Sequence, residues 1–345
     1  MKKTLCLFGL LSVLAVRGGV PAAAQNVPAV PAVVLDTAAV YKNAANPGVV
    51  ETDSPDKYSA VYVISDVHGM YANLLALLRA NGLVDAKNAW TGGGALFVVL
   101  GDSINKGADS VDVIDLWRSL GPQLEAAGGK LVVLLGNHEA EFLADPSGSK
   151  FKPLLVELNS KKIPLEQFRD QAYPRGAFLR SLPLAFRAGR WLFVHSGLYP
   201  AMAWADFKQQ ALSALQAGDY GGDFLAGADS ALEAKNWWSD AGIRASLEKT
   251  AADNGLFGIV FGHMPGAFNV EGADASIDGG RLIKIDNGMA PESGAHPGHI
   301  LEFPEPGKML LNSYPAVNTL SAAGEREPLV PFSLAKTAAA PAEAD

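Results

Sequence analysis

Residues 60–69 read AVYVISDVHG, a short apolar run that ends in an aspartate, a histidine and a glycine. The apolar run, residues 60–65, is typical of a buried strand, and the glycine suits a tight turn. Leucines at helical spacing follow over residues 71–80 and predict an amphipathic helix. This strand, turn and helix therefore begin a layered α/β unit, with Asp66 and His68 directly after the first strand.

The same alternation continues along the chain. Strand patterns recur at residues 95–100 (ALFVVL) and 131–135, and Asp109 or Ser110 is placed to begin the helix between them. The order strand, helix, strand, helix, strand, followed by further strands, predicts an α/β fold built as a two-sheet β-sandwich flanked by helices. The later strands are expected at residues 191–194, 256–261 and 281–285, with a hairpin formed by residues 299–303 and 309–312.

Polar side chains that can bind metal ions follow several of these strands. Each one alone is commonly a turn former, a helix cap or a hydrogen-bonded structural residue. Together they offer only oxygen and imidazole ligands, and we expect them to converge because ligands in such folds sit at the carboxyl ends of the strands. They are Asp66 and His68 in SDVHG, Asp102 in GDSINKG, Asn137 and His138 in GNHE, His195 in HSG and His263 in GHMPG.

These residue types favour a pair of divalent ions. Imidazole, carboxylate and amide oxygen suit Mn, Fe or Zn, whereas Ca prefers more oxygen ligands and Cu prefers more sulfur or nitrogen. Two such ions can clamp a phosphoryl group and activate water, but they repel each other unless an anionic ligand lies between them. Asp102 is the natural bridging ligand.

The blocks DxHG, GDxxxxG, GNHE, HxG and GHxP, in this order, resemble the calcineurin-like metallophosphoesterase superfamily, in particular its phosphoprotein phosphatase type. The flanking stretches AAGGKLVVLLGNHEAEF, GRWLFVHSGL and IDNGM are similar to those of bacterial Shewanella-like protein phosphatases. Pro265 stands where the nuclease and phosphodiesterase types carry a second histidine, which favours the phosphatase type. The resemblance covers about residues 60–300.

The resemblance implies a role for each of these residues. A hydroxide between two metal ions would attack phosphorus in line, and His138 would protonate the leaving oxygen. The implied activity is hydrolysis of phosphomonoesters, on phosphotyrosine or on phosphoserine and phosphothreonine. Asp66 and His68 would hold the first ion, Asp102 would bridge both ions, and Asn137, His195 and His263 would hold the second.

The chain departs from the GDxxDRG motif of the protein phosphatases. Asn105 replaces the acidic residue that orients the catalytic histidine, and it can accept a hydrogen bond without stabilising a positive charge. Lys106 replaces a phosphate-gripping arginine and keeps the charge but not the bidentate geometry. Asn137, Arg175 and Arg244 are the other candidates for binding phosphate. These departures leave hydrolysis of a nucleotide or dinucleoside polyphosphate as the alternative, with a noncatalytic binding protein disfavoured because the catalytic histidine is present.

Other conspicuous side chains are expected to have structural roles. The adjacent Trp237 and Trp238 are more typical of core packing than of a ligand pocket. Asp286, in the IDNGM stretch, is expected to cap a strand end rather than to bind a metal ion.

The composition excludes some functions. The 345 residues carry a formal net charge of −8, so the even positive charge that binds a nucleic acid polymer is absent. The expected partner is instead a phosphorylated protein or peptide, or a small phosphoester. The single cysteine, Cys6, cannot form an internal disulfide.

The chain is expected to divide into four parts. Residues 1–24 are typical of a cleaved secretory signal peptide, because a short apolar run follows two lysines and an Ala-Ala-Ala sequence precedes the cleavage point. Residues 25–56 form an Ala/Pro-rich leader, residues 57–316 form one metallophosphoesterase domain, and residues 317–345 form an Ala/Pro-rich tail. We therefore expect a protein that is exported to the periplasm, or secreted, without a stable membrane anchor. Cys6 would leave with the signal, which excludes a cysteine nucleophile.

Overall fold

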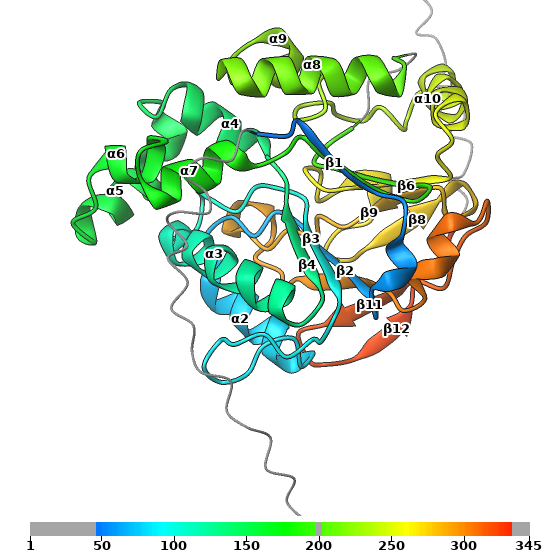
Figure 1. Ribbon diagram of the computed structural model, residues 1–345, viewed down its shortest axis with the longest axis horizontal. Coiled ribbons are helices and arrows are strands. Elements are labelled where there is room, and N and C mark those ends of the chain that lie inside the picture. The colour runs from blue at the N-terminus through cyan, green and yellow to red at the C-terminus, as the bar shows by residue number, and fades with distance from the viewer. Residues whose placement is uncertain (1–45, 198–201, 333–345) are drawn as a thin grey trace, which may run out of the picture. The chain divides into compact units, whose positions relative to one another are not determined.

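A computed structural model describes residues 46–197 and 202–332 of the chain. The expected signal peptide at residues 1–24, most of the expected leader and the end of the expected tail lie outside these described residues. Two six-stranded sheets form the centre of the fold (Figure 1).

The first sheet has the strand order β12-β11-β10-β2-β3-β4. Its strands β2, β3 and β4 run parallel, as expected for strands joined by crossover helices, while β10, β11 and β12 add antiparallel neighbours. The strands are β2 Val61–Ile64, β3 Leu96–Val99, β4 Lys130–Val133, β10 His299–Phe303, β11 Asn318–Ser321 and β12 Arg326–Pro328.

The second sheet has the order β1-β5-β6-β7-β9-β8. It is also mixed, because β6, β7 and β9 run parallel while β5 is antiparallel to β6 and β8 is antiparallel to β9. The strands are β1 Val49–Thr52, β5 Ala185–Ala188, β6 Trp191–Val194, β7 Gly258–Phe261, β8 Ala275–Ile277 and β9 Leu282–Lys284.

Alternate residues along the strands enter two different cores. Trp191 and Phe193 of β6 join Leu96 and Val98 of β3 in one buried cluster, and the ring centroids of Trp191 and Phe303 of β10 lie 5.2 Å apart. The intervening residues of the same strands belong to a second cluster shared with the helices. Side chains with a period of two therefore fill both the space between the sheets and the layer under the helices. This confirms the predicted two-sheet α/β sandwich.

Helices cover the outer sides of this sandwich. Helix α3 packs on β4 and beside α2, while α8 contacts β1 and lies next to α9 (Figure 1). Among the described residues, no helix has the length and hydrophobicity needed to cross a membrane. The helices are α2 Tyr71–Ala80, α3 Ser110–Ala126, α4 Asn137–Ala144, α5 Lys152–Ser160, α6 Leu165–Arg169, α7 Pro174–Ser181, α8 Trp204–Ala217, α9 Asp223–Ala226 and α10 Ala241–Asp253.

Short 3-10 helices complete the secondary structure. They are η1 Pro55–Lys57, η2 Ser149–Phe151, η3 Ala267–Asn269, η4 Asp278–Gly280, η5 Pro291–Ser293 and η6 Pro306–Leu310.

The predicted hairpin of residues 299–303 and 309–312 is wrong. The antiparallel partner of β10 on that side is β11, and the segment expected as its second strand begins in η6 and forms no strand after it. Pro306 begins η6, and Met309 is fully buried in the core between the sheets. A proline cannot donate to a sheet ladder, so the chain turns here and pairs later.

Three strands lie outside the expected domain of residues 57–316. Strand β1 precedes the first boundary and pairs parallel with β5, although its VVET sequence lies in the expected leader. Strands β11 and β12 follow the second boundary and extend the first sheet. All three are short and lack a sustained alternation, and β1 and β12 are edge strands, so the pairing partner rather than the local pattern determines them.

Candidate metal centre and active site

The parallel strands of the first sheet bring the predicted ligands to one edge. Asp66 and His68 follow β2, Asp102 follows β3, and Asn137 begins the helix after β4. Asp66, His68 and Asp102 adopt left-handed backbone conformations, with φ values of 51°, 48° and 51°. Such conformations are unfavourable for residues other than glycine and persist where the surrounding structure enforces them, which is common at functional sites.

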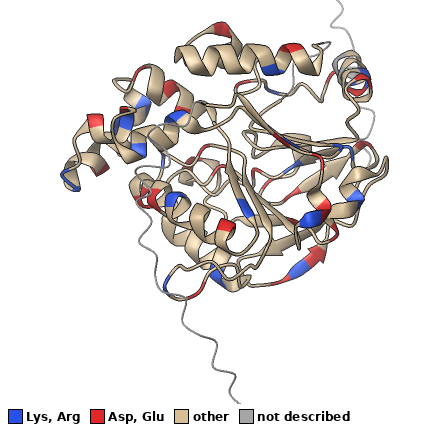
Figure 2. Ribbon diagram, in the orientation of Figure 1, with Lys and Arg blue, Asp and Glu red and all other residues tan. Residues whose placement is uncertain are grey.

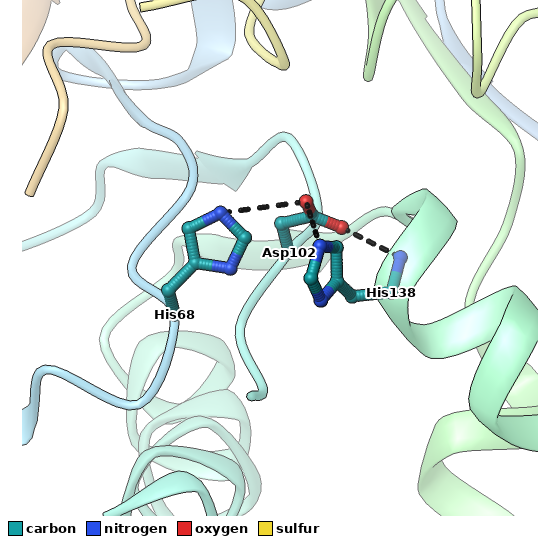
Figure 3. A group of neighbouring side chains, drawn as sticks. All are labelled: His68, Asp102 and His138. Carbon is teal, nitrogen blue, oxygen red and sulfur yellow. Dashed lines mark hydrogen bonds and ion pairs between the residues drawn. The ribbon is translucent and has the colours of Figure 1, made fainter. Parts of the chain in front are cut away.

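Asp102 occupies the centre of the group. Its Oδ2 atom lies 3.6 Å from Nε2 of His68 and 3.9 Å from Nε2 of His138, and its Oδ1 atom lies 3.6 Å from Nε2 of His195. The backbone N–H of His138 also donates to Oδ1 at 2.9 Å. Figure 3 shows the His68 and His138 rings on either side of this carboxylate. The position of Asp102 is the one predicted for a bridging ligand.

The second sheet contributes His195 after β6 and His263 after β7, with ring centroids 5.0 Å apart. The backbone N–H of His263 donates to Oδ2 of Asp66 at 2.9 Å, which ties the ends of the two sheets together. Gly262 permits this approach, because a Cβ atom there would overlap Ser65 Oγ and Asp66 Oδ2. The side chain of His195 is fully buried.

Hydrogen-bond acceptors face one another at this point. Nδ1 of His195 lies 2.8 Å from the carbonyl oxygen of Leu100, so Nδ1 carries the ring proton and Nε2 presents a lone pair. Nε2 lies 3.1 Å from Oδ1 of Asn137, whose amide nitrogen donates to Glu141. Burial lowers the pKa of His195 to about 3, so the ring is neutral at physiological pH. Converging lone pairs of this kind are suited to a cation.

Two unpaired atoms support the same conclusion. Oδ1 of Asp66 and Nε2 of His263 are buried and have no hydrogen-bond partner among the described residues. The atoms of His68, Asp102 and His138, and those of Asp102, His195 and His263, form two groups whose members lie within 4.8 Å of one another. Buried polar atoms normally find partners, so this donor set fits a pair of divalent ions sharing Asp102. His138 belongs to the first group by distance, although its predicted role is catalytic.

Burial disfavours the charged forms of both the carboxylates and the histidines in this centre. It raises the pKa of Asp66 to about 6, and it raises the pKa of Asp102 well above its ordinary value with help from the nearby Glu139 and Asp66 carboxylates. Burial also lowers the pKa of His263 to about 2 and holds the pKa of His68 well below its ordinary value. Carboxylates that resist ionisation and imidazoles that resist protonation are both relieved by a bound metal ion.

Asn105 and Lys106 each contact a histidine of the centre. The amide nitrogen of Asn105 lies 3.1 Å from Nδ1 of His138, and Asn105 has a positive φ of 71°. Nδ1 is therefore the acceptor and the proton of the neutral ring is on Nε2, the atom nearest Asp102. The ammonium group of Lys106 donates to Nε2 of His68 at 2.8 Å, so a cation already lies beside this predicted ligand.

Glu139 is a site residue that the sequence reasoning missed. It is fully buried, and its two oxygens accept four backbone N–H groups: those of Asp102, Ser103, Ile104 and Gly136, at 2.9, 2.7, 3.0 and 3.0 Å. The side chain thus fixes the turn that carries Asp102. The glutamate of GNHE was the available signal, because a glutamate in the first turn of a helix commonly returns to backbone donors before it.

A cavity of about 420 Å³ opens over Asp102 and His138. Its described lining contains three lysines, Lys106, Lys150 and Lys235, in a chain that is acidic overall. Charged residues are otherwise scattered over both the helices and the strands (Figure 2). Lys150 and Lys235 were not predicted, because no motif marks either of them. The remaining lining residues are Asp102, Asn137, His138, Glu141, Glu233, His263 and Met264.

The two arginines suggested for phosphate binding are not brought to this cavity. Arg175 donates to both oxygens of Asp115 on α3, at 2.9 and 2.6 Å. Nη1 of Arg244 lies 3.9 Å from Oδ1 of Asp278, beside a different small cavity. Asn137, the third candidate, does line the cavity.

The tryptophans and Asp286 make contacts of the structural kind expected of them. Trp237 and Trp238 are buried and pack against Phe261, with ring centroids 5.1 and 5.3 Å away. Oδ1 of Asp286 accepts the backbone N–H of Gly288 at 3.0 Å, as a capping side chain does.

Comparison with known proteins agrees with this geometry. The sequence profile of the calcineurin-like phosphoesterase family matches residues 59–287. Shewanella-like protein phosphatase 2 of Arabidopsis thaliana is 31% identical over 84 residues, which are 24% of this chain and 22% of the relative. A symmetrical bis(5'-nucleosyl)-tetraphosphatase of Methylococcus capsulatus is 32% identical over 146 residues, which are 41% of this chain and 44% of the relative. The chain thus spans less than half the length of these curated relatives.

A solved structure shares the fold. The cold-active protein-tyrosine phosphatase of a psychrophilic Shewanella species superposes with a TM-score of 0.65 and 19% identity, covering 84% of each chain. The family match includes all five motif blocks and confirms the family expected from them. The chain belongs to the calcineurin-like phosphoesterase family, a class of metal-dependent phosphoester hydrolases.

Proposed function

We propose that this protein is a dimetal-dependent phosphomonoesterase that acts on phosphorylated side chains of proteins or peptides, on phosphotyrosine or on phosphoserine and phosphothreonine. One observation carries the proposal. His138 lies beside the central Asp102 with its Nδ1 atom held by Asn105, and both His138 and Asp102 face a cavity lined by three lysines. A ring that can supply a proton therefore stands next to positive charge that can hold a phosphate.

The metal ligands in this proposal are those predicted from the motifs. Divalent ions such as Mn, Fe or Zn supply positive charge that polarises phosphoryl oxygens and lowers the pKa of water. Asp66, His68 and Asp102 would hold one ion, and Asp102, Asn137, His195 and His263 would hold the other.

His138 is proposed to donate the proton to the leaving oxygen. The acid form is the ring with a proton on both nitrogens, which donates the Nε2 proton to the leaving oxygen and is left neutral. Burial and the nearby His68 and Lys106 hold the pKa of His138 far below its ordinary value, so the negative charge of a bound phosphate is needed to stabilise that form. The Asn105 amide faces Nδ1 and can present its oxygen to a protonated Nδ1, although it adds no negative charge.

Phosphate binding is proposed to use lysines rather than arginines. Lys106 is close to the metal ligands, and Lys150 and Lys235 line the same cavity. Lys150 is paired with Glu141, which limits its net charge and keeps it at the cavity wall. Because the chain as a whole is acidic, a phosphorylated substrate is held by these local charges and by the metal ions rather than by long-range attraction.

The alternative activity is hydrolysis of a nucleotide or dinucleoside polyphosphate. The similarity to symmetrical bis(5'-nucleosyl)-tetraphosphatases and the Asn105-Lys106 pair favour it. However, among the described lining residues the apolar contribution comes from Met264, and no Phe, Tyr or Trp is available to stack on a base. Nucleotide bases are usually held by apolar and aromatic surfaces, so the cavity favours the monoesterase.

We also propose that the protein works outside the cytoplasm, in the periplasm or secreted. The support is the sequence of residues 1–24, which has two lysines, a short apolar run and an Ala-Ala-Ala sequence at its end. Mass determination of the mature N-terminus from the native host tests this, and an N-terminus that retains residues 1–24 contradicts it.

The experiment that tests the activity compares substrates side by side. Metal-depleted protein is reconstituted with Mn²⁺, Fe²⁺ or Zn²⁺ and assayed for phosphate release from a phosphotyrosine peptide and a phosphoserine peptide, and for cleavage of diadenosine tetraphosphate. We expect the highest kcat/KM on a phosphopeptide. Cleavage of diadenosine tetraphosphate alone would establish the alternative, and binding of metal without hydrolysis of any phosphoester would support the noncatalytic hypothesis. His296→Ala, a histidine outside the described cavity lining, serves as the control variant.

A further inference from the structure

A lysine is completely buried behind the metal centre. Lys284, the last residue of β9, has 0% of its surface exposed. Its ammonium group donates three hydrogen bonds to backbone carbonyl oxygens, those of Pro265 and Val270 at 2.7 Å each and that of Asp286 at 3.1 Å. The three donors of a lysine are thus all used on backbone, and none on a carboxylate side chain.

Two of these carbonyls belong to the loop that carries His263. The loop, residues 262–270, leaves β7 and contains three non-glycine residues in left-handed conformations: His263, Phe268 and Asn269, with φ values of 65°, 62° and 59°. L-residues disfavour this region of backbone space. The loop therefore does not hold its shape through local preference and needs contacts from outside.

Those contacts come from two sides. At the start of the loop, the backbone N–H of His263 is fixed by Asp66. Further along, Lys284 binds the carbonyl oxygens on both sides of η3, at Pro265 and Val270, and so draws the two ends of this segment toward β9. The ammonium group thus holds the two carbonyl oxygens of the loop in place, as a bound monovalent cation would.

The surroundings support a charged lysine at this position. Burial lowers the pKa of Lys284, while the carboxylates of Asp274, Asp286, Glu271 and Asp66 act in the opposite direction. Asp286 and Asp274 are themselves buried. Burial raises the pKa of both of these acids, so the direct stabilisation of the ammonium group comes from the three carbonyl oxygens that accept its hydrogen bonds.

We propose that Lys284 is a positioning residue for the metal centre: by holding the carbonyl oxygens of Pro265 and Val270, it keeps Nε2 of His263 directed at the ion shared with Asp102 and His195. A ring nitrogen of His263 lies within 4.8 Å of the ligand atoms of Asp102 and His195. Its Nε2 atom is buried and has no hydrogen-bond partner in the part of the chain that the structure describes. Lys284 itself contacts neither that atom nor Asp102 in the described hydrogen bonds, so its effect is exerted through the loop. The proposal rests on the metal ligands assigned above.

The test measures metal binding without substrate. Full-length wild-type protein and Lys284→Met are depleted of metal, titrated with Mn²⁺ by calorimetry, and analysed for bound metal by mass spectrometry. We expect two ions in the wild type, and in the variant one ion bound normally and a second bound about 10- to 100-fold more weakly, the size of effect seen when a residue that supports a metal ligand is lost. His263→Ala should weaken the same ion.

A second variant guards against misfolding. Lys284→Gln keeps an amide donor that can reach part of the carbonyl set, so it should fold and bind the second ion with an affinity between those of the wild type and Lys284→Met. The matched control is Glu302→Gln, which changes a buried carboxylate on β10. The carboxylate of Glu302 accepts hydrogen bonds from Asn318 and Arg326. This variant should have lower stability and still bind two ions.

The outcomes separate this inference from the phosphatase proposal. If Lys284→Gln binds both ions with wild-type affinity, the positioning role is overturned, whether or not Lys284→Met folds. Equal weakening of both ions in either variant overturns it as well. A wild type that binds fewer than two ions contradicts the metal centre and this inference with it. A wild type that binds two ions but hydrolyses no phosphoester contradicts only the proposed function.

Discussion

Nε2 of His195 and Oδ1 of Asn137 lie 3.1 Å apart, and both atoms are hydrogen-bond acceptors. Neither can turn away, because Nδ1 of His195 faces the Leu100 carbonyl and the amide nitrogen of Asn137 donates to Glu141. Two fixed lone pairs at this distance repel unless a cation lies between them. The following predictions concern this centre and the residues that support it.

Metal binding should stabilise the fold through Asp102. A ligand that binds only the folded state at about 100 times its Kd adds roughly 2.7 kcal/mol to the free energy of unfolding, so excess Mn²⁺ or Zn²⁺ should raise the Tm of metal-depleted protein by several degrees. Asp102→Asn removes the charge of the shared ligand, so its Tm should respond little to metal. Differential scanning calorimetry with and without metal measures both. A metal response in Asp102→Asn equal to that of the wild type would contradict the bridging assignment.

Removal of His138 should slow catalysis in a way that depends on the leaving group. His138→Ala should lower kcat by about 10²- to 10⁴-fold on a phosphoserine peptide, the usual contribution of a general acid. The loss should be smaller on p-nitrophenyl phosphate, whose leaving oxygen needs no proton. Steady-state kinetics on the two substrates gives the ratio. Equal losses on both would argue for a ligand role of His138 instead, as its membership of the His68 and Asp102 group by distance allows.

Asp66 should contribute stability to the metal-free protein at low pH that is lost as the pH rises. Burial raises the pKa of Asp66 from 3.8 to about 6, so between these pH values this group binds more protons in the folded state than in the unfolded chain. Its contribution to the free energy of unfolding must then fall with increasing pH, by on the order of 2 kcal/mol. His195 and His263 act in the opposite direction, because burial lowers their pKa values to about 3 and about 2. Urea unfolding of the wild type and of Asp66→Asn in a chelator at pH 5 and pH 7 therefore isolates the Asp66 contribution.

The controls for this prediction are a variant and a metal ion. From pH 5 to pH 7, the free energy of unfolding of metal-free Asp66→Asn should change more favourably than that of the wild type, because the group that loses stability over this range is gone. Saturating Mn²⁺ should make the stability of the wild type rise with pH, since metal ligands must be deprotonated to bind. An identical change in the wild type and in Asp66→Asn would contradict a raised pKa of Asp66.

Glu139→Gln should weaken the metal centre without touching a ligand. An amide has one acceptor oxygen, so at least some of the four backbone N–H groups that Glu139 now satisfies would face another donor. We expect a loss of about 3 kcal/mol in the free energy of unfolding and weaker Mn²⁺ binding, measured by urea unfolding and calorimetry.

Glu157→Gln is the matched control for Glu139. Glu157 is also buried, and it accepts the backbone N–H groups of Ser110 and Val111 at 2.8 and 2.9 Å at the start of α3. Its substitution should lower stability and leave metal binding unchanged. If both variants bind Mn²⁺ equally well, Glu139 supports the fold in general and not the Asp102 turn.

Lys235 should act on substrate binding. Lys235→Ala removes a charge from the cavity lining and should raise KM for a phosphopeptide about tenfold, with a smaller change in kcat and a weaker dependence of kcat/KM on salt. Lys308→Ala, on η6, is the control and should match the wild type. An unchanged KM in Lys235→Ala, together with a changed KM in Arg175→Ala or Arg244→Ala, would restore the arginines as phosphate-binding residues.

The local sequence is enough to propose candidate ligands, because most of them follow a strand with a strong apolar pattern. The strand of residues 61–64 is buried on both faces, so its apolar run has little alternative to a central parallel strand, and Asp66 and His68 follow it at the sheet edge. The same argument places Asp102 after β3 and His195 after β6. For these residues, the local sequence pattern is therefore enough to predict their position at the edge of the sheet.

Other features depend on segments far apart in the chain. Lys150, Lys235 and Asp102 share one cavity although no motif contains either lysine, while Arg175 is held by Asp115 instead of phosphate. The strand partner of β10, the two edge strands outside the expected domain and the hold of Lys284 on the His263 loop also arise from packing. Sequence alone therefore determined which chemical groups follow which strands, since strand periodicity and turn residues are local properties. The tertiary structure decided which charges meet them, since that depends on the distances set when the two sheets and their helices close on one core.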